Sequence, residues 1–354
     1  MSEIGTRRLR NQLVLGNQPE TPRNAVATLG AVQAQDYLGA LWAVGLRMHA
    51  GGEEDVERAL EERSIVRTWP LRGTLHFVAA EDVRWMIELL AGRIVRRHAA
   101  RQEREHGLNA SVLRRSRDVV KDALQGGRQL TRPEIYAALE KRRIAAGAQA
   151  GLQILWHLAH QGLICFGPRR GKQQTFVLLD EWLPAGEPMA EEDALAELAR
   201  RYFVGHGPAT VEDFAWWSGL PPAIAKKALE SASPHLAQDK TYWFSPAERH
   251  PRSSANVHLL PPFDELTVGY RDRSAVLDTA FARSVNAGGG MLQAVVMVNG
   301  MVSGTWKREL ARERVRIRAA MFRPLKRNEK RNLEAACERY ARFVGATSAE
   351  LSVS

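Results

Sequence analysis

Residues 131–143, TRPEIYAALEKRR, carry the clearest local folding signal in the chain. Thr131 can cap a helix, Pro133 suits its first turn, and Glu134 completes a capping box. We therefore predict a helix that begins after Thr131. Two neighbouring helices are also predicted: residues 111–127, from Ser111 as N-cap to Gly126, and residues 150–163 with one apolar face.

A hairpin with a basic tip follows these helices. Two apolar runs are separated by PRRGKQ, residues 168–173, which reads as a turn around Gly171. Three helices and a hairpin are the plan of a winged helix, in which the third helix can enter a groove of DNA and the hairpin contacts the backbone. The basic residues at the tip are Arg169, Arg170 and Lys172.

The same plan recurs before and after this segment. Residues 185–250 predict three helices and a short strand, with Thr210 and Asp213 forming a weaker capping box because Asp replaces the usual Glu or Gln. Residues 1–110 predict helices, one of them capped by Asp36, and a hairpin around Leu71–Gly73. We therefore expect three winged-helix units, over residues 1–110, 111–184 and 185–250.

Residues 251–354 change character. Strand-like runs cover 257–270, 292–306 and 315–322, and Asn299-Gly300 is a strong signal for a tight hairpin. A closing helix over 328–345 places its apolar residues on one stripe. We expect a small β-barrel or sheet with one helix, so the predicted fold class is α+β: three tandem winged-helix motifs and a β-barrel-like module.

Composition favours a soluble protein with an acidic partner. The 354 residues carry a net charge of +10, which suits a phosphate-rich ligand such as DNA; the alternative is a basic protein from a genome that uses Arg in place of Lys. No apolar run is long enough for a membrane helix, and the N-terminus lacks a signal-peptide core. The only cysteines, Cys165 and Cys337, fit a reducing cytoplasm, where we expect a nucleoid-associated monomer.

Several chemical signatures are missing or weak. No phosphate-binding loop of the GxxxxGK[ST] type occurs, and the glycines at 288–290 read as a flexible turn. His157 and His160 have a spacing that metals use, but no third ligand is evident, so packing is the favoured interpretation. We predict no metal and no cofactor. The acidic residues Asp264, Glu265 and Asp272 are interpreted as loop-positioning salt bridges, with a metal-dependent nuclease as the alternative.

Two glutamines lie just before a predicted apolar helix. Gln33 and Gln35 should point the same way from an extended backbone, because side chains alternate along a strand. The plain alternative is a polar turn whose amides cap the helix that follows. Tryptophans raise a similar choice: Trp69, Trp306 and the Trp216–Trp217 pair could stack on bases or pack in the core.

Four stretches in order resemble the tandem winged-helix DNA glycosylases of the azinomycin-resistance, or AlkZ-like, type. They are AVQAQDYLGALWAVGLR (31–47), TWPLRGTLHFV (68–78), LLPPFDELTVGYRDRS (259–274) and GMVSGTW (300–306). The resemblance spans nearly the whole chain. It implies a basic, concave DNA-binding face and excision of bulky alkylpurines, including both ends of some interstrand crosslinks.

The resemblance also implies site residues. The Gln-x-Gln motif is the catalytic element of these enzymes, and Gln33 and Gln35 carry it here; a related branch has Gln-x-Asp. Asp36 is interpreted as the helix cap and not as a base. The expected DNA-binding residues are Arg67, Trp69, Arg72, Thr74, His76, Arg169, Arg170, Lys172, Arg271, Arg273, Trp306 and Lys307.

Two amides are chemically sufficient for one class of lesion. An N7-alkylguanine is already cationic, so it can leave without being protonated. Fixed amide dipoles can then orient water and stabilise an oxocarbenium-like sugar. The expected partner is double-stranded DNA with alkylated purines. The competing interpretation is a non-enzymatic winged-helix regulator, which would usually be a dimer that reads paired half-sites.

Overall fold

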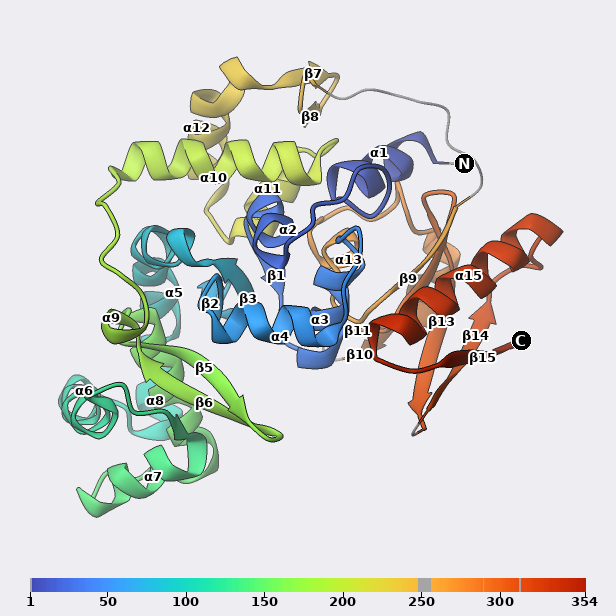
Figure 1. Ribbon diagram of the computed structural model, residues 1–354. Helices are drawn as coiled ribbons and strands as arrows, with labels where there is room; N and C mark the ends of the chain where they lie inside the picture. The colour runs from blue at the N-terminus through green and yellow to red at the C-terminus, as the bar shows by residue number, and fades with distance from the viewer. Residues whose placement is uncertain (1, 248–255, 289, 312) are drawn as a thin grey trace. The chain divides into compact units, whose positions relative to one another are not determined.

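The computed structural model describes residues 2–247, 256–288, 290–311 and 313–354 (Figure 1). The chain forms two compact units, which we call the split unit (Met1–Val56 with Ala196–Ser354) and the central unit (Glu57–Leu195). The boundaries of these two units do not coincide with those of the four predicted segments. The division of the chain into three winged-helix motifs and a C-terminal module stays a prediction. The predicted boundary at 250/251 and the centre of the glycine run, Gly289, lie outside the described residues.

The central unit contains the predicted order of three helices and a hairpin. The sheet order is β4-β6-β5, so the hairpin gains a third short strand from the start of α7. The capping box is confirmed, because Oε2 of Glu134 accepts from the backbone N–H of Thr131 at 2.6 Å. The elements are α6 (Ala110–Leu124), β4 (Leu130–Thr131), α7 (Arg132–Lys141), α8 (Ala148–His160), β5 (Ile164–Arg170) and β6 (Gln173–Leu178).

The cap predicted for α6 is wrong. Its N-cap is Asn109, whose side chain accepts from the backbone N–H of Val112 at 3.0 Å, and Ser111 lies inside the first turn. Both residue types are good caps, so the choice between them depends on where the preceding chain leaves its own helix. That preceding helix is α5 (Val83–His106), which ends at Gly107 in a left-handed conformation.

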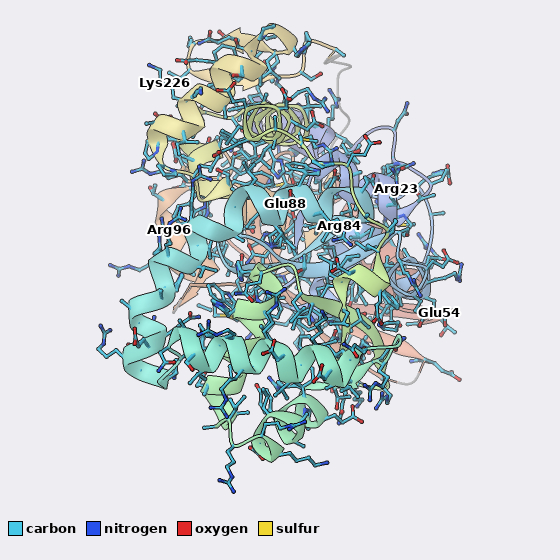
Figure 2. The ribbon with its side chains drawn as sticks, turned by 90° about the vertical axis from the view of Figure 1, so that its left-hand side faces the viewer. Arg23, Glu54, Arg84, Glu88, Arg96 and Lys226 are labelled. Carbon is cyan, nitrogen blue, oxygen red and sulfur yellow. The ribbon has the colours of Figure 1, made fainter. Side chains whose placement is uncertain are left out.

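Helix α8 was expected to be able to enter a groove of DNA, but in the structure helix α5 covers it. The two helices pack together: the rings of His98 and Trp156 are 5.3 Å apart, and Gln102 donates to Gln153 at 2.9 Å. From Ile154 to His160 every residue of α8 is buried. A helix covered in this way cannot present these side chains to base edges. Arg84, Glu88 and Arg96 are spaced along α5 (Figure 2).

A second hairpin shares this core. Strands β2 (Ile65–Leu71) and β3 (Thr74–Ala79) pair antiparallel, and the turn residues Arg72 and Gly73 have φ of 52° and 75°. This is the hairpin predicted around Leu71–Gly73. It packs on the other hairpin, with the rings of Trp69 and Phe166 5.0 Å apart. The remaining elements of this unit are η1 (Ala80–Asp82) and α9 (Leu179–Trp182), while α4 (Glu53–Glu61) crosses its boundary.

The split unit brings the first helices together with the third helical segment. The second predicted capping box is confirmed, because Thr210 and Asp213 exchange hydrogen bonds of 3.1 and 3.2 Å. The boundary between the units falls inside α10. The elements are α1 (Glu3–Asn11), α2 (Pro22–Leu29), β1 (Val32–Gln33), α3 (Tyr37–Gly45), α10 (Glu191–His206), α11 (Val211–Ser218), α12 (Pro222–Ala232), η2 (Ser233–His235), β7 (Ala237–Asp239) and β8 (Tyr242–Phe244).

The C-terminal part of the split unit is a curled, five-stranded half-barrel, not a closed barrel. Its order is β15-β14-β13-β12-β9, so β15 and β9 are the two edge strands of the described sheet. Helix α15 lies across it (Figure 1) and contributes the buried Leu333, Cys337 and Tyr340. The strands are β9 (Val257–Leu260), β12 (Val295–Val298), β13 (Met301–Leu310), β14 (Arg314–Met321) and β15 (Ser348–Val353), with α15 spanning Arg327–Phe343.

Two details differ from the strand-like runs in the sequence. The run after β9 is not a strand: Pro261 and Pro262 lack the N–H that a ladder needs, and the chain turns into α13 (Glu265–Val268). Strand β15, which no pattern predicted, pairs parallel to β14. The Asn299-Gly300 hairpin is confirmed, with φ of 51° and 79°. The connecting elements are η3 (Thr279–Phe281), α14 (Ala282–Val285), β10 (Asn286–Gly288) and β11 (Met291–Leu292).

None of the helices in the described ranges is both long enough and apolar enough to cross a bilayer.

Candidate active site

The two glutamines differ in exposure. Strand β1 covers only Val32–Gln33, and Gln35 lies in the bend before α3, so the alternation of an extended strand does not reach Gln35. Gln33 is 8% exposed, whereas Gln35 is an exposed residue. The expected strand therefore ends before Gln35, and alternation along a strand cannot be used to infer the direction of its amide. Gln35 is the amide that solvent and a ligand can reach most easily.

A buried carboxylate holds the backbone of the motif. The backbone N–H of Gln33 donates to Oε1 of Glu265 at 2.8 Å, and Glu265 has no solvent exposure. Its other oxygen, Oε2, accepts from Nε1 of Trp217 at 3.1 Å and lies 3.2 Å from Nε2 of His206. Three donors from separate segments therefore converge on one side chain, which meets the hydrogen-bonding demand of a buried carboxylate.

His206 completes this network as a neutral donor. It is fully buried, and burial lowers the pKa of His206 even though the hydrogen bond to Glu265 acts in the opposite direction. Its Nε2–H can then donate to Glu265. The ring is stacked 4.8 Å from that of Tyr202, and the hydroxyl of Tyr270 donates to the backbone carbonyl of His206 at 2.6 Å. Several buried contacts thus hold the chain behind the motif.

Asp264 makes the salt bridge expected for the PFDEL stretch. Both of its oxygens lie 2.8 Å from the guanidinium of Arg47, and neither side chain is exposed. Burial opposes the charge of Arg47, but Asp264 outweighs it and raises the pKa of Arg47. Asp272 instead binds its own loop, accepting from Ser274 at 2.8 Å. These acidic residues are committed to internal bonds, which disfavours the nuclease interpretation.

Asp36 does not cap α3, contrary to the prediction. It stands at the N-cap position, but its side chain makes no capping hydrogen bond. The carboxylate lies over Gly39, where a Cβ would come within 2.7 Å of Oδ2. Asp36 also lines a cavity of about 460 Å³ in the split unit, together with Trp306, Lys307 and Arg308. The residue next to Gln35 therefore belongs to a concave surface.

The other expected DNA-binding residues of the split unit divide into two groups. Arg271 and Lys307 are exposed, and Arg273 is half-buried. Burial lowers the pKa of Arg273, and no carboxylate in the described part of the chain forms a salt bridge with it. Trp306 is only 4% exposed and donates to the carbonyl of Leu260 at 2.8 Å, so it is not free to stack on bases outside the cavity.

The hairpin β2–β3 contributes fewer accessible groups than predicted. Trp69 lies in the core of the central unit, and Arg67 is buried with its guanidinium 4.8 Å from the ring centroid of Phe166. His76 is fully buried and donates from Nδ1 to the carbonyl of Thr74 at 2.9 Å, as a packing histidine would. Burial removes all three from direct readout. Arg72 and Thr74 are partly exposed at the turn.

The tip of the hairpin β5–β6 is less cationic than its sequence suggests. Arg169 pairs with Glu57 at 3.0 Å and Arg170 with Glu134 at 2.9 Å. Lys172 is exposed, and within the described ranges it has no ion pair. It is the cation at this tip that can engage a phosphate without first leaving a carboxylate.

The two spaced histidines have local partners. His160 donates from Nδ1 to the carbonyl of Trp156 at 2.8 Å, and Nε2 of His157 lies 3.0 Å from the amide of Gln161. Across the described residues, no group of three His, Cys, Asp or Glu side chains is placed to hold a metal. Cys165 and Cys337 are both free thiols in the interior.

The glutamine motif and its buried support lie within a stretch that matches a known protein family. The model of the AlkZ-like DNA glycosylases matches residues 26–343, a span that includes Gln33, Gln35, Asp36 and Glu265. The chain belongs to the AlkZ-like DNA glycosylase family. Members of this family hydrolyse N-glycosidic bonds, so the chain is a hydrolase of that class.

This AlkZ-like chain is also similar to a glycosylase sequence and to a solved glycosylase structure, both from Streptomyces sahachiroi. An interstrand DNA cross-link repair glycosylase from Streptomyces sahachiroi is 26% identical over an alignment of 324 residues, and the match covers 85% of this chain and 85% of that protein. The solved structure of the Streptomyces sahachiroi DNA glycosylase AlkZ superposes with a TM-score of 0.79 at 23% identity, covering 99% of this chain and 98% of that one. That likeness shows that the fold is shared along the entire AlkZ-like chain.

Three residues of the site escape prediction from the sequence. From the sequence, Glu265 is expected only to form a salt bridge. Nothing in the sequence assigns His206 or the cavity residue Tyr340 to the site. The one sequence feature that could have indicated Glu265 is an acidic pair within an apolar stretch. Carboxylates are rarely buried without partners, so such a pair indicates buried hydrogen bonds. No local pattern indicates which distant backbone such a carboxylate will bind.

Proposed function

We propose that this AlkZ-like protein is a monofunctional DNA glycosylase for cationic N7-alkylpurine lesions. Its substrates include purines joined in an interstrand crosslink, the activity that the name of the Streptomyces sahachiroi relative describes. Gln33 and Gln35 are the catalytic residues. The observation that carries this assignment is the pairing of an exposed Gln35 with a Gln33 whose backbone is held by the buried Glu265.

The chemistry requires only positioning and electrostatic stabilisation. The alkylated base leaves as a neutral purine because it already carries positive charge. Gln35 holds a water against C1′ through its amide oxygen, while Gln33 supports the developing positive charge on the sugar. The electron pair of the broken C1′–N9 bond stays on the purine, and the proton that the added water loses passes to solvent. Neither amide is a strong base, so stable bases such as uracil are not substrates. Asp36 takes no part in activating the water in this proposal.

The exposure of each side chain changes the list of residues that we expect to contact DNA. We propose that Arg72, Thr74, Lys172, Arg271, Arg273 and Lys307 contact the backbone, whereas Arg169 and Arg170 contribute less because they are paired. Burial supports leaving out Arg67, Trp69, His76 and Trp306 as direct contacts. The three winged-helix motifs and the monomeric state belong to the same proposal, with double-stranded DNA as partner.

Base release from a defined duplex tests the proposal. The substrate is a duplex with one N7-methylguanine, and the free base is measured by chromatography. Gln35→Ala should lower kcat by about 100-fold with little change in DNA binding, because a catalytic amide acts mainly in the transition state. Gln33→Ala should follow, to a lesser degree. Gln149→Ala, another exposed amide, is the matched control.

Two outcomes would contradict this function. Full activity of the Gln33→Ala, Gln35→Ala double variant would remove the motif from the chemistry. Tight, sequence-selective binding to undamaged DNA by a dimer, with no base release from the alkylated duplex, would instead favour the regulator.

A further inference from the structure

Trp216 differs from the other tryptophans of the chain. All nine lie in the described ranges, and Trp216 alone is exposed, with 47% of its surface open to solvent. Its neighbour Trp217 has no exposure and donates to the buried Glu265. Exposure alone does not identify a binding residue, because single apolar side chains are common on protein surfaces. The contacts that Trp216 makes are the stronger evidence.

The exposed ring is held at its polar edge. Nε1 of Trp216 donates to the backbone carbonyl of Val268 at 3.1 Å. An indole has no other polar group, so what remains for a ligand is the aromatic surface. A ring that is fixed in this way loses little conformational entropy when a flat group stacks on it.

The carbonyl that holds Trp216 belongs to the same short helix that supports the glutamine motif. Helix α13 begins at Glu265, whose Oε1 accepts from the backbone N–H of Gln33 at 2.8 Å, and it ends at Val268. Three residues of a helix rise by about 4.5 Å, so the two anchor points lie within one turn of each other. Neighbouring nucleotides of one strand are spaced by about 3.4 Å. A strand whose sugar lies at the motif can therefore reach Trp216 with an adjacent nucleotide.

An exposed arginine is tied to the helix that carries Trp216. The backbone N–H groups of Arg271 and Asp272 donate to Oδ1 of Asp213 at 2.9 and 3.2 Å. Asp213 lies on α11, one turn before Trp216. The guanidinium of Arg271 has no salt bridge within the described ranges, while the carboxylate of Asp272 accepts from Ser274. An aromatic ring near a free arginine is typical of sites that bind unstacked bases.

We propose that Trp216 and Arg271 form a stacking platform for the base next to the lesion on the strand that carries the lesion. Trp216 contacts the face of this base, and Arg271 contacts the phosphate beside it. The inference rests on the proposed function and adds a subsite for the flanking nucleotide. Stacking tolerates any sequence because every base has a π face, which suits an enzyme that acts wherever damage occurs. Holding the flanking nucleotide also orients the sugar of the lesion against the motif.

A double-mutant cycle between protein and DNA tests the contact. The duplexes carry one N7-methylguanine and have either a normal base or no base at the flanking position of the same strand, on each side of the lesion in turn. On duplexes with the base, Trp216→Ala should lower affinity and kcat/KM for base release by about tenfold, the size expected for loss of a base–aromatic stack. On the duplex that lacks the contacted base, wild type and Trp216→Ala should be equal.

Two further variants separate stacking from folding. Trp216→Phe keeps a ring but loses the bond to Val268, so it should retain most of the activity and the dependence on the flanking base. Leu310→Ala removes another exposed apolar side chain of the same unit, 54% exposed on β13, and should match the wild type on every duplex. Arg271→Gln should weaken binding to all duplexes and lower its salt dependence, because a phosphate contact does not require the base.

Additive losses would overturn the inference. If Trp216→Ala weakens binding by the same factor with and without either flanking base, or has no effect, Trp216 does not stack there. Coupling with the base opposite the lesion would overturn the choice of strand. A Trp216→Phe protein as impaired as Trp216→Ala, with a lower melting temperature, would assign the effect to the hydrogen bond with Val268.

The failure of this inference can be distinguished from failure of the proposed function. If the wild type releases the methylated base and Trp216→Ala behaves as the wild type does, only the platform is overturned. If the wild type releases no base from any duplex, the glycosylase assignment fails. The cycle measured by affinity alone then still tests whether Trp216 stacks on the flanking base.

Discussion

The backbone N–H of Gln33 donates a 2.8 Å hydrogen bond to Oε1 of Glu265, a carboxylate that is fully buried. The bond joins the glutamine motif to α13, more than two hundred residues further along the chain. Glu265 has no surface accessible to solvent in this arrangement. We propose that Glu265 is a positioning residue, because its carboxylate holds the backbone of the strand that carries Gln33.

Replacing Glu265 should separate positioning from stability. Glu265→Ala leaves the donors of Gln33, His206 and Trp217 without an acceptor, which should cost about 1–3 kcal/mol in the free energy of unfolding. Its kcat should fall while KM changes little. Glu265→Gln keeps one acceptor oxygen and should recover part of kcat. Chemical denaturation and steady-state base release are the measurements; a normal kcat in folded Glu265→Ala would contradict the role.

Gln35→Asp should create a pH-dependent enzyme. The variant has the Gln-x-Asp form and adds a true base at the exposed position of the motif. If water positioning limits the rate, activity should persist and rise with pH through an ordinary Asp pKa of about 4, because only the carboxylate form can accept a proton. The wild type should show no such rise over the same range. A pH profile of kcat for both proteins is the check, and a profile shared by both would contradict the assignment.

Asp36→Asn tests whether the neighbouring carboxylate is a hidden base. The change is nearly isosteric, and the side chain makes no capping hydrogen bond that it would break. If the two glutamines suffice, kcat on N7-methylguanine should stay within about threefold of the wild type, well below the roughly 100-fold or more typical of losing a general base. A loss of the larger size would transfer the role of base from the amides to Asp36.

DNA binding should depend on Lys172 more than on its arginine neighbours. Lys172→Glu places a negative charge at the tip, where the lysine has no ion pair within the described residues, whereas Arg169→Glu also disrupts a pair with Glu57. We expect the affinity of the wild type for undamaged duplex DNA to fall as the salt concentration rises. In Lys172→Gln the slope of log affinity against log salt concentration should become smaller by about 1. Fluorescence anisotropy at several salt concentrations measures both, and a salt-independent affinity would contradict the DNA interface.

Acid should destabilise the central unit through His160. Burial lowers the pKa of His160 to about 4 from its ordinary 6.5. The unfolded chain therefore takes up a proton between these values while the folded protein does not, so stability is complete above pH 6.5 and is lost as pH falls toward 4. In His160→Gln the difference in melting temperature between about pH 7.5 and about pH 5 should shrink. An unchanged difference would show that other groups dominate.

Local chemistry determined much of the secondary structure. The capping boxes at Thr131 and Thr210 and the hairpin turns at Arg72–Gly73 and Asn299–Gly300 all occur where the sequence predicts them. Each depends on hydrogen bonds or on φ preferences between residues close together in the chain, so the sequence contains every partner. The family resemblance has the same origin, because it rests on the residues of four short stretches and on their order along the chain.

Tertiary structure decided which of these residues are accessible. The sequence of α8 is that of a helix with polar and aromatic side chains, yet α5 covers it, and Trp69 and Trp306 look like stacking residues but are buried. The bond between Gln33 and Glu265 and the cavity around Tyr340 depend on segments that are distant in the chain. Burial and long-range hydrogen bonds are properties of packed pairs, and the choice of partner is made by the whole fold, not by the residues near either member.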